Sequence, residues 1–163
     1  MAKVHFVKKS RKEYVDNLTG ETIKAGESYY WWAFRYQPKQ ISKTPPKSSR
    51  LTQSEFLQAV YRIQEEIDVL TAADTIIDQL DNIKNEIKSL KEETEDKIGN
   101  IPDNLQRGST TKLLQSRVDS LQGWFDKFDN IDTEIDKELS KEEKEKRYQE
   151  ILEDVQSHLF EGE

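Results

Sequence analysis

The stretch Tyr29-Tyr30-Trp31-Trp32-Ala33-Phe34-Arg35-Tyr36 decides the fold of the N-terminal part of this 163-residue chain. It holds six of the 15 aromatic residues, and aromatic side chains favour extended strands. The sequence therefore predicts a strand over residues 28–36. Successive side chains of a strand point to opposite faces, so one face would carry Tyr30, Trp32, Phe34 and Tyr36, and the other Tyr29, Trp31, Ala33 and Arg35. We expect the fully aromatic face to form the core.

Shorter segments on both sides of this strand can pair with it. Residues 3–8 alternate weakly in polarity, and residues 40–43 can pair back onto the aromatic strand. Turn-forming residues cluster at 16–20, and Pro45-Pro46 ends the pairing because proline lacks a backbone N–H. The prediction is a curled antiparallel sheet of about three strands within residues 1–50.

Charge divides the chain into two parts. Residues 1–50 carry 11 Lys/Arg and 4 Asp/Glu, a net charge of +7. Residues 51–163 carry 14 Lys/Arg and 28 Asp/Glu, a net charge of −14. A composition with 34% hydrophobic and 35% charged residues favours shallow contacts between helices over a deep globular core. We therefore predict two domains, a basic aromatic β module at 1–50 and an acidic helical coiled-coil region at 51–163.

The second domain is predicted to be helical from its capping signals and its apolar spacing. Thr52 and Glu55 have the spacing of a capping box, in which the Thr52 side chain accepts from the Glu55 amide. Apolar residues then recur every three or four positions, with a slip at residues 71–74. Either one helix runs over 53–98, or it breaks at the slip and Thr71 caps a new segment. The predicted stripe consists of Phe56, Val60, Ile63, Ile67, Leu70, Ile77, Leu80, Ile83, Ile87, Leu90 and Ile98.

Two further helices follow a turn at residues 99–102. The second helix begins after Gly108 and can fold back antiparallel on the first, and the third opens with a capping box from Ser140 to Glu143. The predicted fold class is α+β, a small N-terminal antiparallel β-sheet followed by an elongated antiparallel helical hairpin or coiled coil with a third C-terminal helix. Apolar positions outside the stripe predict a homodimer through the helices; they are Leu57, Tyr61, Ile76 and Leu113.

Several classes of function find no support in the sequence. The chain has no cysteine, and its two histidines, His5 and His158, lie outside any metal-binding motif. No phosphate loop and no nucleophile motif occurs, so we expect no enzymatic activity, no cofactor and no metal. No segment approaches the length of about 18 apolar residues that a membrane span needs, and the start lacks an apolar signal core. We expect a cytoplasmic protein without membrane association.

The basic aromatic module suggests nucleic-acid binding. Bases stack on aromatic rings, and Lys and Arg attract phosphates. The predicted contact set is Arg11, Lys12, Tyr29, Trp31 and Arg35, with Lys8, Lys9, Lys39 and Lys43 as phosphate neighbours. The competing interpretation is that every aromatic side chain is buried, because a small sheet without metal or disulfide needs large side chains to fold.

Two other functions remain open, and the first of them depends on the acidic helices. In one, the protein is an inhibitor or adaptor that binds a host defence or replication factor, and residues 51–163 alone capture that partner. In the other, it is a virion or scaffold component that forms higher-order assemblies. Acidic runs such as residues 126–138 could imitate phosphates, although such runs more commonly form a solvated helix face with ion pairs four residues apart.

Four motifs together resemble a family of proteins. They are the string Ser28-Tyr29-Tyr30-Trp31-Trp32-Ala33-Phe34-Arg35, then Ser42-Lys43-Thr44-Pro45-Pro46, Leu51-Thr52-Gln53-Ser54-Glu55-Phe56-Leu57 and Ile101-Pro102-Asp103-Asn104-Leu105-Gln106. In this order, over nearly the full length, the chain resembles small uncharacterised proteins of bacteriophages and prophages. The resemblance implies a phage origin and the host cytoplasm as the location, and it implies no activity. The prediction is a non-enzymatic, phage-type accessory protein that binds nucleic acid through its sheet and oligomerises through its helices.

Overall fold

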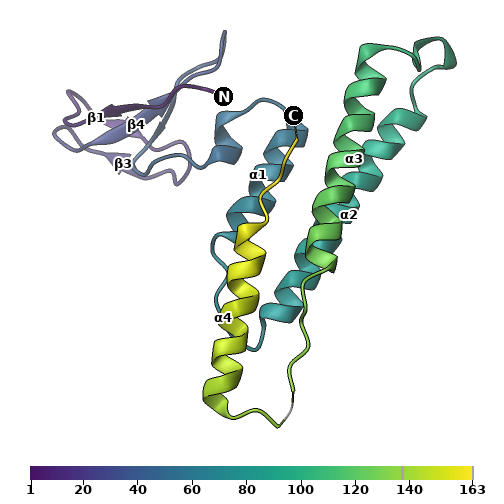
Figure 1. The fold of residues 1–163 in the computed structure, drawn as a ribbon. Coiled ribbons are helices and arrows are strands. Elements are labelled where there is room, and N and C mark those ends of the chain that lie inside the picture. The colour runs from purple at the N-terminus through teal and green to yellow at the C-terminus, as the bar shows by residue number, and fades with distance from the viewer. Residues whose placement is uncertain (137, 163) are drawn as a thin grey trace. The chain divides into compact units, whose positions relative to one another are not determined.

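The computed structural model describes residues 1–136 and 138–162. The chain forms two compact units, Met1–Arg62 and Ile63–Glu163, which are described separately. The first unit contains five short strands, the second contains helices α2 to α4, and helix α1 (Glu55–Ile67) includes residues of both (Figure 1). The fold therefore belongs to the α+β class.

The main sheet of the first unit has three antiparallel strands in the order β1-β4-β5. These are β1 (His5–Val7), β4 (Tyr29–Trp32) and β5 (Gln40–Ser42). The predicted sheet, with the aromatic strand between two short partners, is confirmed. A second, two-stranded sheet of β2 (Tyr14–Val15) and β3 (Thr22–Ile23) was not predicted, and it forms a hairpin around the predicted turn at 16–20.

The central strand is shorter than the sequence predicts. β4 ends at Trp32 because the chain turns, and the Gln37 amide donates to the Phe34 carbonyl at 3.1 Å. Tyr36 takes a φ of 65°, in the left-handed region, and its side chain is 89% exposed. The prediction that four aromatic residues on one face form the core is therefore wrong. Of that face, Trp32 is buried at 2% exposure, while Tyr30 and Phe34 are half-buried.

Asp16 is a buried carboxylate that ties the hairpin to the main sheet. Its Oδ1 accepts hydrogen bonds from the Leu18 and Thr19 amides at 2.7 and 3.2 Å. Its Oδ2 accepts from the Lys43 amide at 2.7 Å and from the Ser42 hydroxyl at 3.3 Å. Burial raises the pKa of Asp16, but the hydrogen bonds together outweigh burial and hold this pKa below its ordinary value. The charged form is thus the one that the fold stabilises.

We expect Asp16→Asn to destabilise the first unit by about 2–3 kcal/mol, because an amide cannot replace a carboxylate that accepts four hydrogen bonds. A depressed folded-state pKa stabilises the fold above the pKa of the unfolded chain, about 3.9 for Asp, and this stabilisation is lost as the pH falls through the folded-state pKa. Chemical denaturation at pH 7 and near pH 3 checks this. The difference in unfolding free energy between wild type and variant should shrink at the lower pH, and an equal difference at both values would contradict this role of Asp16.

The long helix that the sequence permits over 53–98 is broken. α1 ends at Ile67 and α2 (Ile76–Gly99) begins nine positions later, so the alternative with a break is confirmed. Ile67 and Ile76 are both buried. In one continuous helix, nine residues at about 100° each would place them on opposite faces. The segment 68–75 resets the helical phase and lets both side chains be buried.

The helix caps differ from those predicted. Ser54, rather than Thr52, caps α1, since the Leu57 amide donates to the Ser54 hydroxyl at 3.4 Å. The Thr52 hydroxyl instead accepts from the Ser54 amide at 3.2 Å, in the turn before the helix. α2 follows Thr75, so the prediction that Thr71 caps it is wrong.

In the second unit, α2 and α3 (Ser109–Asp129) lie side by side and run antiparallel (Figure 1). Lys84 of α2 approaches Asp129, at the end of α3, at 3.5 Å. Hydrogen bonding to Asp81 raises the pKa of Lys84, and Asp129 adds to this effect. The buried residues are Ile76, Leu80, Ile83, Ile87, Leu90 and Thr94 on α2, and Val118, Leu121, Trp124 and Phe128 on α3. The buried stripe thus contains Ile76, whereas the predicted stripe had Ile77, which is half-buried. Ile76 is therefore not available to a partner.

Helix α4 (Lys141–Ser157) and the segment after it complete this unit. The predicted capping box is confirmed, with Ser140 accepting from the Glu143 amide and Glu143 accepting from the Ser140 amide. After the helix, the His158 carbonyl accepts from the Trp124 indole at 2.9 Å, and the Phe160 ring lies 5.3 Å from that of Trp124. Among the described residues, no helix is both long and apolar enough to cross a membrane.

Candidate nucleic-acid interface

One face of the main sheet carries the predicted aromatic contacts, and we call it the Trp31 face. Residues paired across antiparallel strands point to the same side, and so do alternate residues along a strand. The pairs His5–Trp31, Val7–Tyr29 and Trp31–Ile41 therefore place these side chains together. Trp32 points to the opposite face, into the core. The prediction that Tyr29 and Trp31 lie on the opposite face of the strand from Trp32 is confirmed.

The indole of Trp31 lies between a ring and a cation. The His5 ring stacks on it at 4.1 Å with an angle of 8° between the planes. The Lys39 Nζ lies 4.1 Å from the centre of the indole. Because His5 belongs to the strand on one side of β4, and Lys39 precedes the strand on the other side, they cover opposite faces of the indole. Trp31 is thus half-buried rather than exposed, and Lys39 occupies the position that a stacked base would take.

A second pair of rings continues the Trp31 face. Tyr14 and Tyr29 lie 5.1 Å apart, and Lys12 approaches the Tyr14 ring at 5.3 Å. Burial raises the pKa of Tyr29, and a hydrogen bond with the Tyr14 phenol raises it further. The Tyr29 phenol therefore stays neutral at physiological pH.

The other predicted contact residues have different surroundings. Lys8, Lys9 and Arg11 are exposed in the bend after β1, which the Ser10 amide anchors by donating to the Glu27 carbonyl at 2.8 Å. Lys43 follows β5 and forms an ion pair with Glu27 at 3.7 Å. Ring contacts therefore group Lys12, Tyr29, Trp31 and Lys39. Among the described residues, no such contact joins Lys8, Lys9, Arg11, Arg35 or Lys43 to this group.

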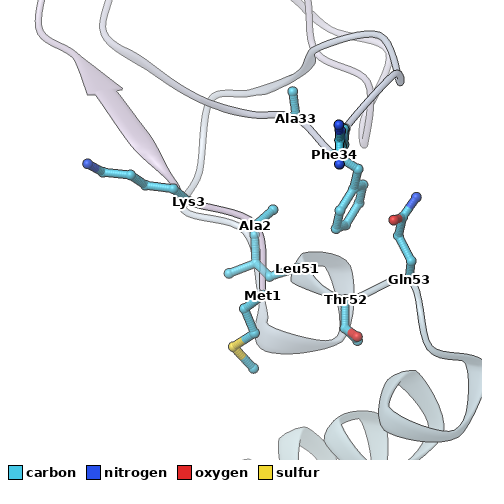
Figure 2. Close-up of a pocket in the computed structure, with 9 residues that line it drawn as sticks. Met1, Ala2, Lys3, Ala33, Phe34, Leu51, Thr52 and Gln53 are labelled. Carbon is cyan, nitrogen blue, oxygen red and sulfur yellow. The ribbon is translucent and has the colours of Figure 1, made fainter.

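Arg35 lies in the turn after β4, with its guanidinium 4.9 Å from the Tyr36 ring. It also lines an open hollow of about 340 Å³ in the first unit (Figure 2). Lys3, Phe34, Thr52 and Gln53 are among the other lining residues. Ala33 lines the hollow as well, two positions beyond Trp31. The hollow therefore lies beside the end of β4.

Sequence reasoning missed two residues of the Trp31 face, His5 and Tyr14. The signal for His5 was its place in the first strand, at the position that pairs with Trp31 once the register is known. Tyr14 lies in a strand of only two residues, which has too few positions for a polarity pattern to reveal it. Both residues are recognised only when the strands are paired.

Lysine and arginine side chains are paired differently in the two units. Helices α2 and α4 carry ion pairs such as Lys91–Glu95, Lys97–Glu93 and Arg147–Glu150. In the part of the chain that the structure describes, several cations of the first unit have no carboxylate within ion-pair distance; they are Lys3, Lys8, Lys9, Arg11, Lys12, Arg35 and Lys39. These charges are available to an anionic partner.

Comparisons with protein-family models, curated proteins and solved structures found no match for this chain. Within residues 1–136 and 138–162, no group of three or more His, Cys, Asp or Glu side chains is arranged to hold a metal ion. The residues of the Trp31 face and their charges are therefore the features of this chain that indicate a function.

Proposed function

We propose that the protein binds nucleic acid through the Trp31 face and that its helices determine its oligomeric state. It would act as a non-enzymatic accessory protein of phage type in the cytoplasm. The observation that carries this proposal is the Trp31 indole between His5 and Lys39, on a face with Tyr29, Tyr14 and Lys12. Aromatic rings alternating with unpaired cations are the chemistry that bases and phosphates require.

A nucleic-acid base can replace the Lys39 ammonium on the Trp31 indole. A cation over an exposed ring contributes about 0.5–1 kcal/mol, whereas a base stacked on an aromatic ring contributes about 1–3 kcal/mol. A base can therefore displace the Lys39 ammonium from the indole. The released ammonium is then close enough to pair with the phosphate of the same nucleotide, so its interaction is replaced rather than lost.

The first test is a titration of the full chain with labelled single-stranded and double-stranded DNA at two salt concentrations. Anisotropy and tryptophan fluorescence are followed together. If about four phosphates are contacted, the logarithm of the affinity should fall with the logarithm of the salt concentration with a slope of about −3 for a single strand. Trp31 emission should be quenched at the same time, because a stacked base contacts the indole.

Absence of binding at low salt would overturn the proposal. The search would then move to a protein partner for the acidic helices, such as a host defence or replication factor. The ion pairs within α2 and α4 already engage several acidic side chains, which weakens that alternative.

We further propose that the antiparallel helices act as an elongated hairpin of coiled-coil type that forms a homodimer. Leu113 on α3 supports this, since it is 41% exposed next to the buried stripe. Sedimentation equilibrium of wild type and Leu113→Glu tests it. We expect a dimer that the variant weakens, and a wild-type monomer at high concentration would contradict the dimer.

A further inference from the structure

We infer that the hollow beside the Trp31 face receives one unstacked nucleotide, so that the preferred ligand is a single strand. This inference rests on the proposed function and specifies its ligand. Three properties of the hollow support this inference: its position, the side chains that line it and its size.

The hollow lies beside the ends of β1 and β4, close to Trp31 in the chain. Trp31 pairs with His5, and the residues two positions further along, Ala33 and Lys3, both line the hollow. Two residues of chain span at most about 7 Å. A strand of nucleic acid with a base on Trp31 therefore meets the rim of the hollow at its next step.

The lining residues offer one group for each part of a nucleotide. The Phe34 ring is half-buried and extends toward Leu51, Thr52 and Gln53, so one side of the hollow is aromatic (Figure 2). The Gln53 side chain is exposed and offers both a donor and an acceptor to the edge of a base.

Arg35 supplies the positive charge for a phosphate at the hollow. Lys3 and Arg35 line the hollow, and in the described part of the chain neither has a carboxylate within ion-pair distance. None of the nine lining residues is acidic. The Lys3 side chain extends away from Phe34 and Gln53 (Figure 2). A phosphate that leads into the hollow would therefore meet the Arg35 guanidinium, which can hold it through two hydrogen bonds.

The size of the hollow favours a single strand over a duplex as the ligand. A volume of about 340 Å³ lies at the lower end of the range for small-molecule sites and suits a single base with its sugar. A base within a duplex can enter only if it is unpaired and unstacked, which weakens duplex binding. A single strand is free of this cost.

The experiment compares a labelled oligothymidine with a duplex of the same length at one salt concentration. The full chain is tested as wild type, Phe34→Leu and Gln53→Ala, with Gln37→Ala as the matched control because Gln37 is exposed in the turn and does not line the hollow. We expect wild type to bind the single strand at least tenfold more tightly than the duplex. Each hollow variant should lose about three- to tenfold in single-strand affinity with duplex affinity unchanged.

The outcomes separate this inference from the proposed function. Wild-type affinity in both hollow variants, or equal affinity for single strand and duplex, overturns the inference and leaves the Trp31 face as the binding site. No binding of either ligand by wild type overturns the proposed function as well. If Phe34→Leu melts at a lower temperature than wild type, Gln53→Ala decides, because an exposed glutamine has no part in the core.

Discussion

Replacing Trp32 with alanine is expected to unfold the sheet and to leave the helices intact. Within residues 1–50, all of which the structure describes, the buried hydrophobic side chains are Ile23 and Trp32. Truncating a buried tryptophan costs about 3–5 kcal/mol. A small sheet with neither disulfide nor metal has about that much stability in total. Loss of the dispersed amide signals of residues 1–50 in an NMR spectrum, with helical circular dichroism retained, would be the result.

Trp31→Ala is the matched control, since it removes the same side chain from the neighbouring position on the opposite face. Trp31 is half-buried against His5 and Lys39, so its removal should lower the melting temperature far less than Trp32→Ala does. Equal destabilisation by the two substitutions would mean that both faces are core. The competing interpretation from sequence, in which every aromatic residue is buried, would then hold.

The double variant Trp31→Ala/Arg35→Gln is expected to lose about 2–4 kcal/mol of nucleic-acid binding free energy, roughly 30-fold to several hundredfold in affinity. The variant would lack the base stacked on Trp31 and the charge-assisted contact between Arg35 and a phosphate. Anisotropy titration with single-stranded DNA measures the effect. The helices should be unaffected, because both residues lie in the first unit.

A second double variant controls for the loss of one aromatic ring and one charge. Phe6→Ala/Lys47→Gln removes a ring that is 58% exposed on the opposite face of the sheet and a cation that lies outside the Trp31 face. Its affinity should stay within about twofold of wild type at moderate salt. A loss as large as that of the first variant would show that binding depends on net charge alone.

The sequence predicts the sheet well where the pattern is local. The aromatic run, the two short partners and the turn at 16–20 follow from β propensity and turn residues, and the structure contains all of them. The end of β4 could not be predicted, because the chain at Tyr36 takes a left-handed conformation that aromatic residues seldom adopt. The hydrogen bonds of the Asp16 carboxylate could not be predicted either, because its partners Ser42 and Lys43 lie more than 25 positions away in the sequence.

The candidate site likewise contains residues that the sequence predicts and residues that it does not. Tyr29, Trp31, Lys12 and Lys39 follow from composition and from alternation along the strand. His5 and Tyr14 depend on the register between strands, which side-chain chemistry alone does not fix. Arg35 was placed on the same face as Trp31 by extending the alternation beyond the point where the strand ends, and the turn moves it to the hollow.

The reset between α1 and α2 bears on how such a chain can change length during evolution. Deleting one residue inside α2 rotates every following side chain by about 100° and takes Leu80, Ile83 and Ile87 off the buried stripe. Residues 68–75 carry no such periodicity to preserve, because the helical phase begins anew at Ile76. Insertions and deletions should therefore accumulate in this segment. The helices on either side of it would not tolerate them, because each has a buried stripe with fixed spacing.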